Sequence, residues 1–109
     1  MKHGERVMER ELEPLISLFR LLADKTRVHI LMMLSDGERN VGSLCEELGL
    51  PQPTVSHHLG LLRMQNLISN RRNGKQIYYA LNGHVNTLRG EGLEVVVDSF
   101  NVRINVRKN

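Results

Sequence analysis

The chain has 109 residues, an apolar fraction of 40%, a charged fraction of 25% and a formal net charge of +3. These values are typical of one soluble domain with a modest core. No apolar run approaches the roughly 20 residues needed to span a bilayer, and residues 1–6 lack the apolar segment of a signal peptide. We therefore expect a cytoplasmic protein with no membrane contact. Its single cysteine excludes an internal disulfide.

The first expected element is an apolar helix near the N-terminus. Residues 5–12 are charged and predict a helical lead-in, and Pro14 stands where a helix starts or kinks. Apolar side chains then surround much of the circumference, namely Leu15, Ile16, Leu18, Phe19, Leu22 and Ala23. A helix this apolar needs cover on two sides. The second cover is either another subunit or the core of the same chain. Asp24 then predicts the N-cap of a helix over residues 25–34.

Residues 40–64 predict two helices joined by a glycine turn. Val41, Leu44, Cys45 and Leu48 form one inward stripe, and Gly49 follows at the position that favours a left-handed residue. Prolines open the next helix, whose apolar stripe is Val55, Leu59 and Leu62. Its opposite face carries Thr54, Ser56, His57 and Gly60. This arrangement is typical of a helix-turn-helix, whose second helix enters the DNA major groove. An ordinary helical hairpin is the alternative interpretation.

Charge along the sequence favours the DNA-binding interpretation. Residues 48–90 contain no Asp or Glu but five Arg or Lys, whereas residues 1–47 carry seven basic and nine acidic side chains. Residues 91–109 carry three of each sign. The whole positive excess therefore falls on the second helix and the segment after it, as expected of a surface that contacts phosphates.

A basic hairpin is predicted directly after the helix-turn-helix. Residues 67–72 are expected to form one strand and residues 76–81 the return strand, with Asn73-Gly74 as the two-residue turn. Arg71, Arg72 and Lys75 surround the tip, so we interpret the hairpin as a wing. A solvated loop is the simpler interpretation of these charges, but their place beside the second helix disfavours it.

The last residues are ambiguous. Asn82 predicts the cap of a helix that extends to about Arg89. Leu93, Val96, Val97 and Phe100 have helical spacing, yet residues 95–97 are all β-branched and residues 102–107 alternate strictly. We expect a short helix and then a β-hairpin with its turn near residues 99–101.

Three segments resemble the ArsR/SmtB-type winged-helix repressors. These are Leu22-Ala23-Asp24-Lys25-Thr26-Arg27 with Ile30-Leu31; Pro51-Gln52-Pro53-Thr54-Val55-Ser56-His57-His58-Leu59 with Leu62-Arg63; and Asn73-Gly74-Lys75 with Tyr78-Tyr79-Ala80-Leu81. The resemblance covers roughly residues 12–89. It implies a mainly α (α+β) winged helix-turn-helix of order α-α-α-α-β-β-α and a homodimeric repressor that an effector usually releases from DNA. A C-terminal β-hairpin would be an addition to that order.

The chain departs from the family pattern at the sensing positions. Members that bind thiophilic metals carry Cys-x-Cys where this chain has Asn40-Val41-Gly42. Members that sense zinc-like ions carry paired ligands on a last helix, where this chain offers only His84, with Glu91 and Glu94 beyond it. A metal site needs about three or four ligands, so we predict no metal site of these kinds and no cofactor. The effector, if there is one, stays unknown. Cys45 is expected to be buried and inert.

The expected DNA contacts come from the second helix of the helix-turn-helix and from the wing. Gln52, Thr54, Ser56 and His57 are predicted to meet base edges and nearby phosphates, while Arg63, Arg71, Arg72 and Lys75 would contact the backbone or minor groove. His58 is expected nearer the domain side. Many relatives have Lys or Arg at the position of Gly60, so its glycine removes a phosphate contact. The dimer interface is predicted at Leu15, Leu18, Phe19 and Leu22.

The sequence therefore predicts a sequence-specific, dimeric regulator that binds double-stranded DNA at an inverted repeat. It forms one domain over residues 1–109, with a lead-in at 1–12, a core at 13–89 and an extension at 90–109. The leading alternative is a winged-helix protein-interaction module that does not read DNA. An enzyme is a third possibility, but no nucleophile–base pair, paired carboxylates or phosphate-binding glycine loop is visible.

Overall fold

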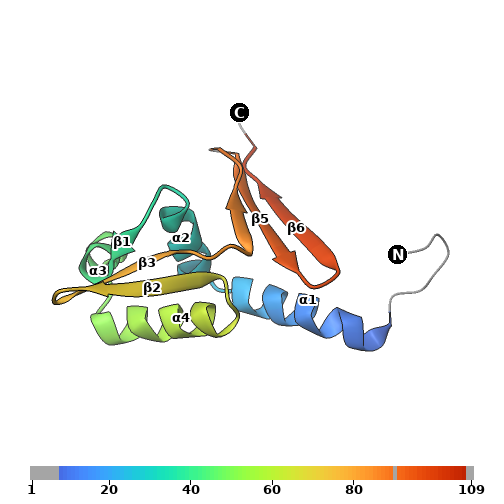
Figure 1. Ribbon diagram of the computed structural model, residues 1–109, viewed down its shortest axis with the longest axis horizontal. Coiled ribbons are helices and arrows are strands. Elements are labelled where there is room, and N and C mark those ends of the chain that lie inside the picture. Colours follow the sequence, from blue (N-terminus) through green and yellow to red (C-terminus); the bar gives the residue numbers. More distant parts are fainter. Residues whose placement is uncertain (1–7, 90, 108–109) are drawn as a thin grey trace.

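A computed structural model describes residues 8–89 and 91–107 of the chain (Figure 1). Within these ranges lie α1 (Glu9–Leu22), α2 (Lys25–Leu34), β1 (Arg39–Asn40), α3 (Val41–Leu48), α4 (Gln52–Met64), β2 (Ile68–Asn73), β3 (Gln76–Leu81), β4 (Val85–Thr87), β5 (Gly92–Val97) and β6 (Phe100–Asn105). The strands form two antiparallel sheets, with strand orders β1-β3-β2 and β4-β5-β6. In the ranges that the structure covers, no helix is both long and apolar enough to span a bilayer.

Local capping signals mark the starts of α2 and α3 and the end of α3, and those at Asp24 and Gly49 were predicted. The Asp24 carboxylate accepts a hydrogen bond from the backbone N–H of Arg27 at 3.1 Å and so caps α2. Asn40 caps α3 in the same way, through the Ser43 N–H at 2.7 Å. Gly49 ends α3 with φ of +66°, a conformation that costs little only for glycine. The turn between α3 and α4 therefore has the predicted geometry.

The first helix is longer than the expected apolar segment. It begins at Glu9, so the charged lead-in and the apolar part are continuous, and Pro14 lies inside the helix. The proline neither starts the helix nor ends it; it removes one N–H donor from the helical ladder. Leu18 and Leu21 are the buried residues of α1.

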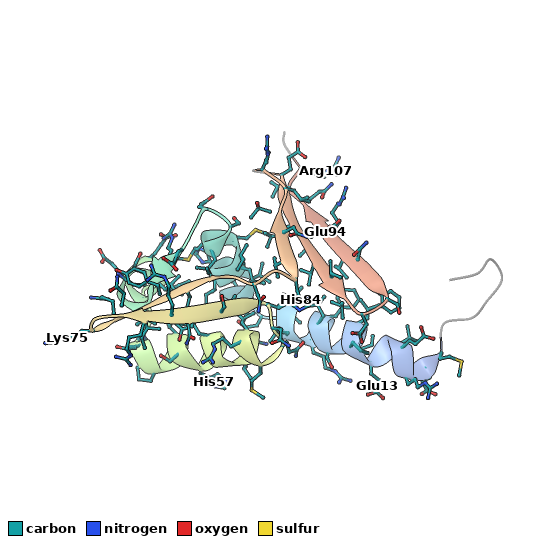
Figure 2. All side chains as sticks on the ribbon, viewed as in Figure 1. Glu13, His57, Lys75, His84, Glu94 and Arg107 are labelled. Carbon is teal, nitrogen blue, oxygen red and sulfur yellow. The ribbon has the colours of Figure 1, made fainter. Side chains whose placement is uncertain are left out.

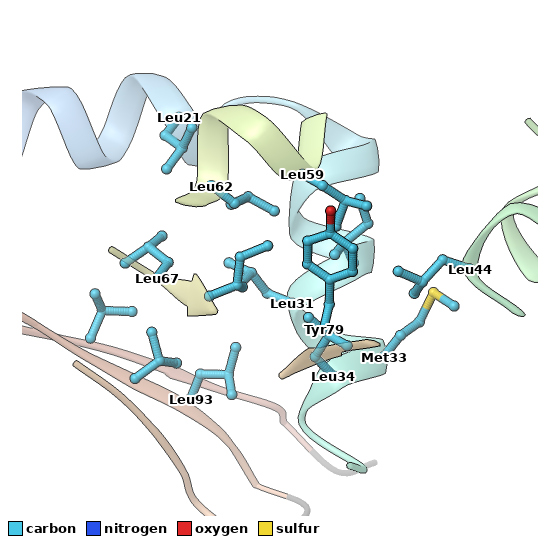
Figure 3. Close-up of a cluster of buried hydrophobic side chains, with 14 of the residues drawn as sticks. Leu21, Leu31, Met33, Leu34, Leu44, Leu59, Leu62, Leu67, Tyr79 and Leu93 are labelled. Atoms are coloured by element: carbon cyan, nitrogen blue, oxygen red, sulfur yellow. The ribbon is translucent and has the colours of Figure 1, made fainter. Parts of the chain in front are cut away.

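One cluster of buried side chains joins the helices to both sheets (Figure 3). Val55, Leu59 and Leu62 of α4 have no exposed surface, which confirms the predicted inward stripe. They share the cluster with Ile30 and Leu31 of α2 and with the following side chains from the rest of the fold: Leu44, Leu67, Ile68, Tyr79, Val85, Leu93 and Val95. Because Leu93 and Val95 belong to β5, the C-terminal sheet is anchored in the same core as the helix-turn-helix.

The hairpin that we interpret as the wing forms, but its turn lies one residue later than predicted. Asn73 pairs with Gln76, so Gly74 and Lys75 form the two-residue turn, rather than Asn73 and Gly74. Gly74 has φ of +64° and so takes the first central position of the turn, where glycine is favoured.

The predicted helix from Asn82 to Arg89 is wrong. The Asn82 side chain accepts from the next residue, Gly83, at 2.6 Å, and the chain continues into β4, which pairs with β5. The expected short helix around Leu93 is also absent, because Leu93 and Val95–Val97 belong to β5. The C-terminal hairpin is confirmed, but its turn is at Asp98–Ser99, earlier than the predicted turn near residues 99–101, because Phe100 and Asn101 already pair within β6. The winged helix-turn-helix therefore ends in a second sheet rather than a last helix.

Candidate nucleic-acid interface

Helix α4 presents a polar face to solvent. The side chains predicted to meet DNA on this helix, Gln52, Thr54, Ser56, His57 and Arg63, are all exposed. Figure 2 shows His57 projecting from α4 away from the rest of the fold. Because the opposite stripe is fully buried against α2 and α3, the rotation of α4 about its axis is fixed. Short polar groups on such a face can approach a groove closely.

The wing extends this surface with basic side chains. Arg71, Arg72 and Lys75 are exposed on β2 and at the turn, and Lys75 lies at the outermost tip of the hairpin (Figure 2). Strand β2 follows α4 directly, through Asn66, which has φ of +61°. That short connection places the wing beside α4 (Figure 1), the arrangement that the sequence predicts for a phosphate-binding surface.

Arg71 is engaged by an acidic residue that the sequence analysis missed. Its Nε and Nη2 atoms donate to the two carboxylate oxygens of Glu38 at 2.8 and 2.7 Å, and its guanidinium lies 4.8 Å from the ring centroid of Tyr78. This hydrogen-bonded pair lowers the pKa of Glu38 below its ordinary value. Residues 48–90 contain no acidic residue, but the fold brings Glu38 against the wing, so the wing surface is not free of acidic side chains. Arg72 and Lys75 have no ion pair among the described side chains.

A second missed cluster joins α2 to α4. The Arg27 Nε donates to the backbone oxygen of Leu21 at 2.6 Å, and its Nη1 lies 3.1 Å from His58 Nδ1. Asp24 lies 3.9 Å from both side chains. His58 is thus half-buried beside α2, as expected, while His57 next to it is exposed. A basic residue in the first turn of a helix opposes the helix dipole, and this is the signal by which Arg27 could have been singled out.

The predicted dimer residues divide between the core and the surface. Leu18 is only 1% exposed and packs in the core of this chain, so that part of the interface prediction is withdrawn. Leu15 and Leu22 are half-buried, and Phe19 is 47% exposed. Leu12 and Ile16 are also exposed, at 38% and 42%. The apolar stripe that remains uncovered on α1 is therefore Leu12, Ile16 and Phe19, at helical spacings of four and three.

The sensing positions carry no assembled ligand set in the described ranges. No group of three or more His, Cys, Asp or Glu side chains there could hold a metal ion. Cys45 is half-buried rather than fully buried and packs against the core. A Cβ atom added at Gly60 would meet no other atom within 4 Å. Space around this position therefore does not require a glycine.

Comparison with known proteins identifies the family. The model for the arsR family of bacterial regulatory proteins matches residues 24–70, which hold α2, the helix-turn-helix and the start of the wing. The transcriptional repressor SdpR of Bacillus subtilis is 38% identical over 66 residues, which cover 61% of this chain and 73% of SdpR. The chain belongs to the arsR family.

Other arsR-family relatives extend the comparison. KmtR, an HTH-type transcriptional regulator of Mycobacterium tuberculosis, is 49% identical over 74 residues, which cover 67% of this chain but 57% of KmtR. Among solved structures, HlyU from Vibrio cholerae superposes with a TM-score of 0.65 at 34% identity, covering 70% of this chain and 83% of HlyU. The homodimeric winged helix-turn-helix DNA-binding domain Mb0332 of Mycobacterium bovis gives 0.64 at 29% identity, covering 76% and 77%. These likenesses confirm the winged helix-turn-helix fold.

Proposed function

We propose that this arsR-family chain is a sequence-specific DNA-binding transcriptional regulator that acts as a homodimer and represses its target genes. The observation that carries the proposal is the face of α4. Its stripe of Val55, Leu59 and Leu62 is fully buried, the polar side chains of Gln52, Thr54, Ser56 and His57 are exposed on the opposite face, and a basic hairpin lies beside the helix. The names of SdpR, a repressor, and of Mb0332, a homodimeric DNA-binding domain, support the same function.

The proposed contacts differ in kind between α4 and the wing. Gln52, Thr54, Ser56 and His57 would meet base edges, since an amide pairs with adenine and hydroxyls adapt to several acceptors. Arg72 and Lys75 would contact phosphates, joined by Arg63 at the end of α4 and by Arg71 once phosphate competes with Glu38. Phosphate contacts fix the register of the protein on DNA, whereas base contacts select the sequence.

We also propose a domain organisation and a cellular location for the chain. We propose that residues 1–109 form one domain, with the core at 13–89 and an extension at 90–109. The C-terminal sheet starts with β4, just before the extension, and its other two strands lie in the extension. Leu93 and Val95 support this unity because they are buried together with α2 and α4. The protein would act in the cytoplasm, where its DNA lies, and would have no catalytic role.

A protein-interaction module is the alternative function. An α4 built for protein contacts would expose apolar or acidic side chains. On this helix only Met64, at the last position and 80% exposed, is an exposed large apolar residue, and the first turn holds no acidic residue. The surface chemistry therefore favours a polyanion over a protein partner.

Operator selection from random duplexes tests the proposed function. We expect an inverted repeat whose half-sites are about one DNA turn, roughly 34–36 Å, apart. Thr54→Ala and His57→Ala should each relax discrimination at particular base pairs by about 1–3 kcal/mol. Asn86→Ala, an exposed change on β4, is the matched control and should leave the selected sequence unchanged. Recovery of no sequence above background would contradict the proposal.

Regulation is proposed not to depend on Cys45. Cys45 lies on α3 against the core, with Leu44 beside it fully buried, and the chain has no second cysteine to resolve an oxidised thiol. Wild type and Cys45→Ser should hold DNA equally when zinc, cadmium, arsenite or peroxide is titrated into the complex. Release of the wild type alone at low micromolar effector would identify Cys45 as a sensor.

A further inference from the structure

Strand β6 leaves a long backbone edge without a partner among the residues that the structure describes. It is the outer strand of the sheet β4-β5-β6, and it spans six residues, Phe100–Asn105. In the two-residue hairpin, Phe100 pairs with Val97 and Val102 with Val95, so backbone groups of even-numbered residues point to β5. Val106 follows the same alternation, because its backbone N–H points to the neighbouring segment and donates to the backbone oxygen of Glu91. The N–H and C=O groups of Asn101, Arg103 and Asn105 therefore point outward from the sheet.

The side chains of β6 alternate between two faces. Phe100, Val102 and Ile104 share the apolar face that β5 buries through Leu93 and Val95, yet they are themselves only half-buried. The opposite face carries Asn101, Arg103 and Asn105, which are exposed. Arg103 donates to Glu94 on the neighbouring strand at 3.1 Å. The apolar face of the sheet thus continues past the cover that the chain itself provides.

Pairing of β6 with β6 of a second copy would give the outward N–H and C=O groups hydrogen-bond partners and would extend the apolar face of the sheet. An antiparallel register centred on Val102 sets Val102 opposite its own copy, Phe100 opposite Ile104, and Asn101 opposite Arg103. Apolar side chains then meet on one face and an amide meets a guanidinium on the other, which are favourable cross-strand pairs. A register centred on Arg103 would instead set two like charges opposite each other, which is destabilising.

We propose that β6 is a dimerisation strand: two copies of this chain join their C-terminal sheets edge to edge, in a register centred on Val102, into one six-stranded sheet. This inference deepens the homodimer of the proposed function and rests on it. Asn101 and Arg103 of each copy exchange two backbone hydrogen bonds with their counterparts, so four such bonds cross the twofold axis.

The pattern of β6 itself supports a second copy as the occupant. In an antiparallel pair centred on Val102, the alternation of Phe100, Val102 and Ile104 with Asn101 and Arg103 is complementary to itself. Helix α1 passes the turn of the β5–β6 hairpin (Figure 1) and packs toward the sheet through Pro14 and Leu18.

The other long edge in the fold is unsuited to this role. Strand β2 is the outer strand of the wing sheet, but all of its residues except Ile68 are exposed, and Arg71 and Arg72 lie along it. Charged side chains on an edge strand oppose pairing with another strand. Strand β4, at the far side of the C-terminal sheet, has only three residues.

Disulfide trapping tests the proposed register. In a Cys45→Ser background, Val102→Cys should form a crosslinked dimer under mild oxidation. Residues opposite each other at this kind of position have Cα atoms about 4.5 Å apart, within the range that a disulfide spans. Asn101→Cys alone should not crosslink, because each Asn101 is then opposite Arg103. Combining Asn101→Cys with Arg103→Cys should restore crosslinking. Crosslinking of Arg103→Cys alone, with none for Val102→Cys, would overturn the register.

Blocking the edge tests the strand itself. Arg103→Pro removes an N–H that points away from β5, so the hairpin within the chain keeps its hydrogen bonds. Sedimentation should show a monomer at micromolar concentration, with an unchanged circular dichroism spectrum. Arg103→Ala, which keeps the N–H, should stay dimeric. A folded, dimeric Arg103→Pro would overturn the proposal, and its inability to fold would leave the crosslinking experiment to decide.

The two proposals fail in distinguishable ways. A dimer that binds its operator but whose β6 variants neither crosslink nor dissociate would overturn the strand pairing and leave the regulator intact. A crosslinked dimer that binds no duplex would support the strand pairing and contradict the regulator. Crosslinking of Val102→Cys only to a different protein would show that β6 serves another partner.

Discussion

The two three-stranded sheets are both antiparallel, but their outer hairpin strands, β2 and β6, present different surfaces. In the wing sheet, β2 carries Arg71 and Arg72 along its outer edge, and nearly all of its side chains are exposed. In the C-terminal sheet, β5 is anchored in the core by Leu93 and Val95, and β6 extends the same apolar face to an open edge. Charged side chains on an edge strand oppose pairing with another strand, which leaves β2 accessible to phosphate. An apolar, self-complementary edge strand can pair with a second strand. Under the two proposals, DNA and the partner subunit contact separate parts of the molecule.

The largest expected effect tests whether α4 and the C-terminal sheet share one hydrophobic core. Leu59 of α4 is 0% exposed and Leu93 of β5 is 1% exposed. Leu59→Ala and Leu93→Ala should each lower the free energy of unfolding by about 2–5 kcal/mol. Chemical denaturation should show one transition that moves in both variants. A Leu93→Ala variant with an unchanged midpoint would mean that the C-terminal sheet is not part of the cooperative unit.

The glycines of the two sheets should differ in what they tolerate. A Cβ at Gly92 would lie 1.7 Å from the backbone oxygen of Ile104, and Gly92 also has φ of +137°. Gly92→Ala should therefore cost about 3 kcal/mol or more and disrupt β5–β6 pairing. At Gly74 nothing lies within 4 Å, so Gly74→Ala should cost only the strain of its φ, about 1–2 kcal/mol. Thermal unfolding compares them, and equal costs would contradict this account.

A lysine on α4 should strengthen DNA binding without harming the fold. Space is free around Gly60, and replacing a helical glycine gains roughly 0.5–1 kcal/mol of stability. Gly60→Lys should also steepen the salt dependence of DNA binding by about one phosphate per protomer. Gly60→Ala is the matched control for helix propensity alone. If both variants bind DNA alike, α4 does not approach the backbone at this position.

The smallest effect concerns the ion pair on the wing. The lowered pKa of Glu38 means that its pairing with Arg71 contributes at pH values above the unfolded value near 4.5. That contribution is lost as the pH falls through the lower folded value. Glu38→Gln should abolish this pH dependence of the free energy of unfolding, which chemical denaturation of both proteins across acidic pH would measure. It should also raise DNA affinity by a few-fold, because Arg71 is released. Weaker binding by Glu38→Gln would show that Glu38 instead positions the wing.

Local signals explain why the helix-turn-helix and the wing were predictable. Asp24 and Gly49 each act within a few residues along the chain, so their effect follows from the sequence alone. The stripe of α4 was predicted for a similar reason, because three buried residues at helical spacing fix one face. The family resemblance placed these elements in order.

The C-terminal region was harder because its signals conflict. Leu93, Val96 and Val97 match a helix, but the β-branched run favours a strand, and pairing of β5 with β4 and β6 decides the outcome. Contacts between distant residues were also beyond sequence patterns. Glu38 and Arg71 are 33 positions apart, and Arg27 and His58 are 31 apart. The core position of Leu18 depends likewise on how α1 packs.

The most direct test of the central claim is the salt dependence of DNA binding, measured by fluorescence anisotropy on a selected operator. Each neutralised phosphate contributes about −0.9 to the slope of log affinity against log salt, so a dimer using its α4 and wing cations should give a slope between about −3 and −7. Replacing Arg71 and Arg72 together with Ala should weaken binding to all duplexes and flatten the slope. A wild-type slope near zero would contradict the claim that this surface binds DNA.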